Sequence, residues 1–120
     1  MNLIIDIGGT HIRFLIGEIL LKEKHSFNSL EDIIYTIDNF IKSLEKNEKE
    51  ITNIIIGLPG MIHNNISYND SNLKFLFKNE LPKKIMNYKT IFYNDGDLSI
   101  IGEINYNKLD KNKRIISLLF

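Results

Sequence analysis

The sequence of 120 residues predicts an α/β fold, in which a mixed sheet opens with a β-hairpin and is flanked by helices. Two strand-like segments, residues 2–7 and 11–20, stand on either side of Gly8–Thr10. An amphipathic helical pattern follows, and short apolar runs then alternate with further helical patterns. Strands that alternate with helices after an opening hairpin favour a single sheet with helices on its faces.

The composition limits the classes of partner. The 15 basic and 15 acidic residues cancel, which leaves no electrostatic attraction for nucleic acid or for an anionic membrane. The chain contains no cysteine, so disulfides and thiolate metal sites are excluded. Asp6 interrupts the first apolar run before a signal peptide could form, and no apolar stretch approaches the length of a membrane span. We therefore expect a cytoplasmic protein with no nucleic-acid and no membrane partner.

The first half of the chain predicts three strands and one helix. Residues 2–7 and 11–20 have the β-branched and aromatic content of strands, and residues 21–27 fit a third, more polar strand. Ser29 is suited to cap a helix, because acidic residues occupy the next turn and apolar residues then recur at helical spacing. These apolar residues are Ile33, Ile34, Ile37, Phe40, Ile41 and Leu44.

The second half predicts further alternation of strands and helices. Residues 53–59 form a continuous apolar run that ends in Gly and Pro, which suits a strand buried on both faces. We predict a short helix at 76–87, although Pro82 within it counts against a continuous helix, because proline lacks the amide that a helix interior uses. The remaining predictions are an irregular or hairpin region at 61–75, a short helix at 97–106, and strands at 90–95 and 113–120.

The pentapeptide Asp6-Ile-Gly-Gly-Thr10 lies at the tip of the predicted hairpin. Adjacent glycines let backbone amides point at an anion, and Thr10 adds a hydroxyl donor. Asp6 could hold Mg²⁺ beside that anion, directly or through water. The segment is neither a P-loop nor a dinucleotide fingerprint, since it lacks the P-loop lysine and precedes a strand. An ordinary type I′ hairpin turn, for which Gly-Gly is favoured, remains the alternative.

Two other motifs end predicted strands. Pro59-Gly60 turns the chain sharply at the carboxyl end of a strand, where open α/β sheets bind ligands, although a plain turn has the same sequence. Asn94 and Asp95 end the next predicted strand with an amide beside a carboxylate. Such a pair can bind vicinal hydroxyls while the carboxylate accepts a proton, but Asn and Asp are also common helix caps. His25 and His63 are isolated, and we expect both to be solvated or structural.

Taken in order, these motifs resemble those of the ROK-type sugar kinases and bacterial glucokinases, members of the actin-like ATPase superfamily. The resemblance covers essentially the whole chain. It implies an amino-terminal ribonuclease H-like lobe over residues 1–112, with residues 113–120 as the first strand leading into a carboxy-terminal lobe. The matching segments are Asp6–Thr10, Leu58–Gly60, Ser71–Leu73, Asn94–Asp95 and Gly102–Glu103.

The resemblance implies ATP-dependent phosphorylation of a hexose or an amino sugar, with ATP and Mg²⁺ as cofactors. Asp95 would be the catalytic base that accepts the proton of the attacking hydroxyl, and Asp6 would help to bind Mg²⁺. The residues that would bind the ATP phosphates are Gly8, Gly9 and Thr10, and those that would contact the sugar are Gly60, Asn72, Asn94 and Asp95.

The chain departs from the family pattern in three places. His11 stands where the family commonly has Lys, which removes a positive charge near the phosphates, and Gly96-Asp97 replaces Ala-Asn. The second Gly-rich phosphate loop of the family would follow Phe120, so we expect the chain alone to be inactive. The apolar segment 113–120 is expected to pair outside this chain, as in a homodimer or with a second lobe.

Two other functions fit the same motifs. ROK-type regulators sense sugars without catalysis. In those regulators a DNA-binding segment precedes the first strand, whereas in this sequence the first strand follows Met1 directly, which argues against a regulator. An actin-like ATPase that does not act on sugars is the other alternative.

Overall fold

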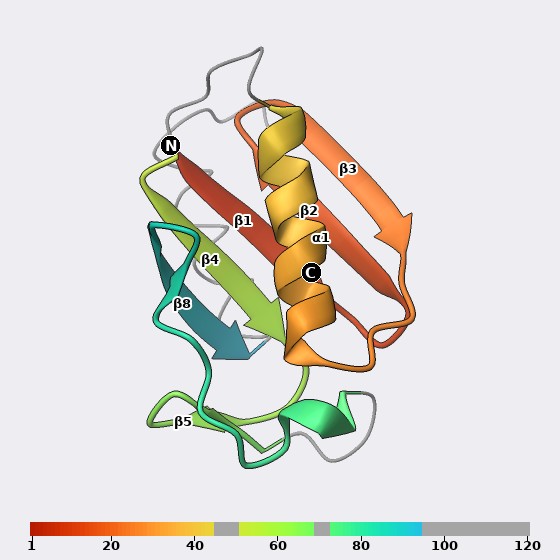
Figure 1. Cartoon of the computed structure of the whole chain (residues 1–120), viewed down its shortest axis with the longest axis vertical. Helices are drawn as coiled ribbons and strands as arrows, with labels where there is room; N and C mark the ends of the chain where they lie inside the picture. Colours follow the sequence, from red (N-terminus) through yellow and green to blue (C-terminus); the bar gives the residue numbers. More distant parts are fainter. Residues whose placement is uncertain (45–50, 69–72, 95–120) are drawn as a thin grey trace.

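The computed structural model describes residues 1–44, 51–68 and 73–94 (Figure 1). A six-stranded sheet has the strand order β3-β2-β1-β4-β8-β7, and a separate two-stranded sheet pairs β5 with β6. The predictions for Asn72 and Asp95, for the helix at 97–106 and for the strand at 113–120 lie outside the described residues. The strands of the large sheet are β1 (Asn2–Ile7), β2 (His11–Ile16), β3 (Ile19–Lys24), β4 (Asn53–Leu58), β7 (Lys84–Ile85) and β8 (Tyr88–Asn94).

The sheet is mixed, as the sequence predicts. Strand β1 pairs antiparallel with β2 and parallel with β4, and β4 pairs parallel with β8. Five of the six residues in β1 and in β4 are buried, in keeping with their nearly continuous apolar sequences. The central strands are therefore covered on both faces, and the α/β class of the fold is confirmed.

A turn at Gly17 divides the segment 11–20, so the prediction of one strand there is wrong. Ile16 pairs directly with Ile19 across a two-residue connection. Gly17 has φ +58°, a conformation that favours glycine at the first position of a type II′ hairpin turn. A Cβ on Gly17 would also lie 2.9 Å from Cε of Met1. The third strand consequently begins at Ile19, two residues earlier than predicted.

The helix α1 (Leu30–Ser43) confirms the amphipathic prediction. Ser29 caps it, since its Oγ accepts a hydrogen bond from the Asp32 amide at 3.1 Å. The aromatic rings of Phe40 in α1 and Phe14 in β2 stack with their centroids 4.2 Å apart. Figure 1 shows α1 lying across one face of the sheet over β1 and β2. Its buried residues are Ile33, Ile37, Phe40 and Ile41.

The connection from β4 to β8 is a hairpin followed by an irregular segment. β5 (Ile62–His63) and β6 (Ile66–Ser67) are joined by Asn64 and Asn65, both with positive φ, which confirms the hairpin alternative for residues 61–75. The irregular segment is fixed to this hairpin, because the Leu81 amide donates to Asn65 O at 2.9 Å.

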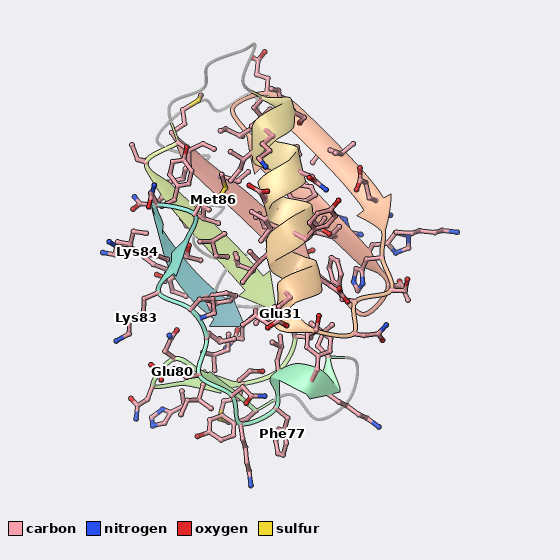
Figure 2. The ribbon with its side chains drawn as sticks, viewed as in Figure 1. Glu31, Phe77, Glu80, Lys83, Lys84 and Met86 are labelled. Carbon is pink, nitrogen blue, oxygen red and sulfur yellow. The ribbon has the colours of Figure 1, made fainter. Side chains whose placement is uncertain are left out.

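The helix predicted at 76–87 is wrong. The only helical turn described in this region is the 3₁₀ helix η2 (Lys74–Leu76), and β7 then forms an antiparallel pair with β8. Lys78 and Met86 adopt positive φ, and Pro82 lacks an amide, so a continuous helix cannot pass through this segment. In Figure 2 the side chain of Phe77 points away from the sheet, and Met86 lies beside β7. No helix among the described residues is long and apolar enough to span a membrane.

Candidate functional site

The sheet brings three of the predicted motifs to one edge. Because β4 pairs in parallel with both β1 and β8, the carboxyl ends of the three strands lie at the same end of the sheet. Leu58 is paired with Asn94, so the turn at Pro59-Gly60 starts beside the end of β8. Gly8–Thr10, here called the glycine loop, follows β1 at this same edge (Figure 1).

The glycine loop is open towards solvent. The Gly8 amide donates to His11 O at 2.8 Å. Of the described glycines, only Gly17 and Gly60 have positive φ, so the loop is not the type I′ turn that the sequence also allows. Within the described part of the chain, the amides of Gly9 and Thr10 donate to no acceptor. Two successive amides without an acceptor form the kind of concavity that binds an anion.

Asp6 lies just before the glycine loop and forms an ion pair with Arg13. Arg13 is the cross-strand partner of Asp6, and its Nη1 donates to Asp6 Oδ2 at 3.0 Å. The Asp6 side chain is 9% exposed and that of Arg13 28%. Burial raises the pKa of Asp6, and the hydrogen bond and positive charge of Arg13 oppose this rise without cancelling it.

The ion pair belongs to a row of residues that crosses five strands. Lys22 is paired with Arg13, Asp6 with Gly57, and Gly57 with Tyr93. The neighbours of Asp6 within β1 point into the core beneath α1, so the row lies on the opposite face of the sheet. Gly57 leaves no side chain next to Asp6 on the side away from Arg13. The carboxylate therefore has a cation on one side and a glycine on the other.

His11 lies among positive charges. Its Nδ1 is 2.9 Å from Thr10 Oγ1, and its cross-strand partner is Lys24. Desolvation lowers the pKa of His11, and the charges of Lys22, Arg13 and Lys24 lower it further. The hairpin still has cations near the glycine loop, although position 11 is His where the family commonly has Lys. Arg13, Lys22 and Lys24 lie on the same face of the hairpin as His11.

His25 contacts the glycine loop twice, which the sequence analysis missed. Its Nε2 is 2.6 Å from Gly8 O, and its amide donates to Thr10 O at 2.9 Å. The ring stacks on Phe27, with centroids 4.0 Å apart. The sequence signal that could have revealed this contact is the turn at Gly17. That turn pairs Ile16 with Ile19, and continuing the same pairing along both strands places residue 25 opposite residue 10. Position in the hairpin, rather than residue type, identifies this histidine.

The residues expected to bind sugar are only partly described. Gly60 has φ +86° in the turn after β4, a conformation that strains any other residue. Asn94 is the half-buried last residue of β8. Asn72 and Asp95 lie outside the described residues, so their roles stay predictions.

The residues around Asp6 fit a magnesium ion held together with phosphates. Across the described ranges, no group of three or more His, Asp or Glu side chains could hold a metal. Mg²⁺ bound with a nucleotide, however, needs only one or two carboxylates, because phosphates and water complete its shell. Asp6 meets this requirement at the edge of the glycine loop. Its second oxygen has no hydrogen bond to Arg13.

These features define a class of protein. A sheet that opens with an antiparallel hairpin, continues through parallel strands and has a glycine loop after β1 has the ribonuclease H-like (actin-like ATPase) fold. A family model narrows the class: the ROK family model matches residues 2–116, and the chain therefore belongs to the ROK family. No curated protein matches the sequence closely enough to count as a relative.

Solved structures of the same fold come from several bacteria. A ROK family glucokinase from Streptomyces griseus, in complex with glucose and AMPPNP, matches with TM-score 0.67 and 18% identity over 88% of this chain and 36% of its own. A candidate N-acetylmannosamine kinase from Listeria monocytogenes has TM-score 0.65 and 16% identity over 91% and 41%. A ROK family protein from Streptococcus pneumoniae, in complex with sucrose, has TM-score 0.57 and 22% identity over 89% and 39%. The chain spans about two fifths of the length of these structures.

Proposed function

We propose that this chain is the amino-terminal lobe of a kinase that transfers phosphate from ATP to a hexose or an amino sugar. The observation that carries the proposal is the glycine loop, with two amides that have no described acceptor, beside the carboxylate of Asp6 at the edge where β8 ends. Family membership and the sugar kinases among the structural neighbours support the same function.

ATP would bind through its phosphates at the glycine loop. The amides of Gly9 and Thr10 and the Thr10 hydroxyl would donate hydrogen bonds to phosphate oxygens. Gly8 would allow the phosphates to approach the backbone. Asp6 would hold Mg²⁺, which neutralises phosphate charge when it is bound. The glucokinase neighbour binds AMPPNP, a nucleotide with a triphosphate-like chain, which supports ATP as the cofactor.

The sugar would bind beyond the ends of β4 and β8. Gly60, Asn72 and Asn94 would contact its hydroxyl groups. Asp95 would accept the proton of the attacking sugar hydroxyl. The oxygen of that hydroxyl would bond to the γ-phosphorus while the bond from phosphorus to the ADP leaving group breaks. The residue assignments rest on the family motifs, and the glucose-bound neighbour supports the class of substrate.

The proposed function would require more than these 120 residues, because the chain spans about two fifths of the length of the solved structures that it matches. Residues 1–112 would form the lobe, and residues 113–120 would begin the connection to a second lobe that closes the nucleotide site. We expect the isolated chain to phosphorylate neither glucose nor N-acetylmannosamine at ordinary rates. Pairing through residues 113–120, with a second copy or with the second lobe, would complete the sheet edge.

A coupled assay of ADP release tests the proposal. The chain is assayed with and without the sequence that its gene encodes after Phe120, against glucose, N-acetylglucosamine and N-acetylmannosamine. A second phosphate loop of the form G-T-G-x-G and sugar-dependent ADP release from the longer protein are the expected results. Sugar-dependent turnover by the 120-residue chain alone would contradict the two-lobe proposal. ADP release that no sugar stimulates would indicate an actin-like ATPase of another kind.

The Asp6–Arg13 ion pair favours one other candidate function, a sugar sensor without catalysis. An arginine that already neutralises Asp6 competes with Mg²⁺ for the same carboxylate. A sensor would bind sugar in a calorimetric titration but would release no ADP. Binding accompanied by turnover would exclude the sensor.

A further inference from the structure

We infer that His25 is a positioning residue that aims the Gly9 amide at the nucleotide phosphates. The inference deepens the proposed function and depends on it only for the identity of the ligand. His25 lies directly after β3 and is far from the glycine loop in sequence, but it is the residue whose ring contacts the loop from the β3 side.

The contact acts through one peptide group. Gly8 O and the Gly9 N–H belong to the same planar trans peptide, in which the carbonyl and the amide point in opposite directions. His25 Nε2 holds Gly8 O at 2.6 Å. With the carbonyl held towards β3, the Gly9 amide must point the other way. A hydrogen bond to the carbonyl also polarises the amide of that peptide and strengthens it as a donor.

The same contact keeps the loop open. In a closed two-residue hairpin, Gly8 O would accept from the His11 amide, as His11 O accepts from the Gly8 amide here at 2.8 Å. The ring of His25 takes the place of the His11 amide at Gly8 O. The His25 amide meanwhile donates to Thr10 O at 2.9 Å. One residue therefore holds the carbonyl groups of Gly8 and Thr10, the two residues on either side of Gly9.

Hydrogen bonds fix the tautomer of the ring. The Phe27 amide donates to Nδ1 of His25 at 3.2 Å, so Nδ1 is the acceptor and the proton of the neutral ring lies on Nε2. That proton points at Gly8 O. The stack on Phe27, with an interplanar angle of 11°, sets the plane of the ring. The donor that faces the loop is therefore fixed in position and in chemical identity.

Two substitutions separate the role of the donor from that of the ring. His25→Gln places an amide nitrogen where Nε2 lies and retains a donor for Gly8 O, whereas His25→Asn resembles only the Nδ1 side and cannot reach Gly8. His63→Gln, in the exposed β5 strand, is the matched control. The protein that includes the sequence encoded after Phe120, labelled with ¹⁵N, is titrated with Mg·ATP, and the Gly9 amide resonance is followed by NMR.

We expect His25→Asn to shift the Gly9 resonance of the nucleotide-free chain, to speed its hydrogen exchange and to weaken Mg·ATP binding about five- to tenfold, the loss typical of one hydrogen bond. We expect His25→Gln and His63→Gln to stay within about twofold of the unsubstituted chain, because neither removes the donor. Wild-type Gly9 behaviour in His25→Asn, or equal losses in both His25 variants, would overturn the inference.

A measurement on the unsubstituted chain covers the case in which His25→Asn does not fold. The ¹⁵N shifts of the His25 ring should identify a protonated Nε2 and an unprotonated Nδ1, and the reverse assignment would overturn the inference. If the Gly9 resonance depends on His25 as expected but the longer protein, with the sequence encoded after Phe120, binds no Mg·ATP, the positioning role stands and the proposed kinase function fails.

Discussion

Arg13 Nη1 donates a hydrogen bond to Asp6 Oδ2 at 3.0 Å, and the two residues are directly opposite each other in the pairing of β1 with β2. Arg13 thus partly offsets the cost of burying the carboxylate of Asp6. We expect Arg13→Gln to lower the free energy of unfolding by about 2 kcal/mol at neutral pH, because it leaves a buried charge without its partner. Urea unfolding in the presence of EDTA measures this loss. Lys42→Gln, which breaks the exposed Lys42–Asp38 pair, should cost less than about 0.5 kcal/mol.

The same pair predicts how stability depends on pH. The pKa of Asp6 is raised in the folded chain, so the folded state takes up a proton more readily than the unfolded state. The contribution of Asp6 to stability is therefore largest below the unfolded pKa and falls as the pH rises through the folded pKa. Arg13→Gln removes interactions that lower this pKa, so the fall should become larger and extend to higher pH. In Asp6→Asn the fall in stability with rising pH should disappear. A fall of unchanged size in this variant would contradict the assignment of the pH dependence to Asp6.

Two glycines should respond differently to substitution by alanine. Gly60 has φ +86°, and forcing an alanine into the left-handed region costs about 1–2 kcal/mol. A Cβ on Gly8 would lie 3.6 Å from His11 O, an ordinary contact, and Gly8 does not have positive φ. We therefore expect Gly60→Ala to shift the urea midpoint clearly and Gly8→Ala to shift it by much less. A larger shift for Gly8→Ala would show that the loop is more tightly packed than the structure indicates.

The stacked pair Phe14–Phe40 joins α1 to the sheet. Phe14 is fully buried, so Phe14→Ala should cost about 3–5 kcal/mol through lost burial and the cavity that remains. Phe77→Ala is the comparison, because Phe77 is 38% exposed, loses less apolar burial and should therefore cost clearly less than Phe14→Ala. Thermal unfolding followed by circular dichroism compares the two. Equal losses would contradict the assignment of Phe14 to the core.

Substitution of the two carboxylates tests the proposed chemistry in the longer protein. Asp95→Asn should reduce turnover by several orders of magnitude and leave the sugar affinity largely unchanged, because the amide binds hydroxyls but accepts no proton. Asp6→Asn should instead raise the Mg²⁺ concentration needed for half-maximal rate. Steady-state kinetics with varied sugar and varied Mg²⁺ separate the effects. A near-normal rate for Asp95→Asn would remove that residue from the role of base.

Among the described residues, the sequence predicts α1 and the central strands correctly, because periodicity and capping are local signals. Ser29 and the apolar repeat after it are sufficient to place α1, and the continuous apolar run 53–59 is sufficient to place β4. The prediction of a short helix fails at 76–87, where left-handed residues and tertiary hydrogen bonds impose an extended path. Conformations of that kind depend on the hairpin at Asn64–Asn65, which no short window of sequence contains.

The candidate site also has features that the local sequence predicts and features that only the tertiary structure reveals. The motifs at Gly8, Gly60 and Asn94 are visible in the sequence, and the parallel strands bring them to one edge of the sheet. The contacts of Arg13 and His25 are not visible, because each depends on the pairing register of the opening hairpin. The residue that replaces lysine at position 11 attracts attention in the sequence, whereas the neighbouring cations become apparent only in the structure.

The strand order has a consequence for how the two halves of the site form during folding. The glycine loop joins β1 to β2, and His25, which holds it, directly follows β3; these three strands pair through contacts close in sequence. The end of β8 joins them only after β4 has paired with β1 across an intervening helix. Because contacts that are near in sequence close faster, the glycine loop, where we propose that the nucleotide binds, can form while the chain is still being synthesised. The end of the sheet at Gly60 and Asn94, where we propose that sugar binds, must wait for the rest of the sheet and is therefore the later product of folding.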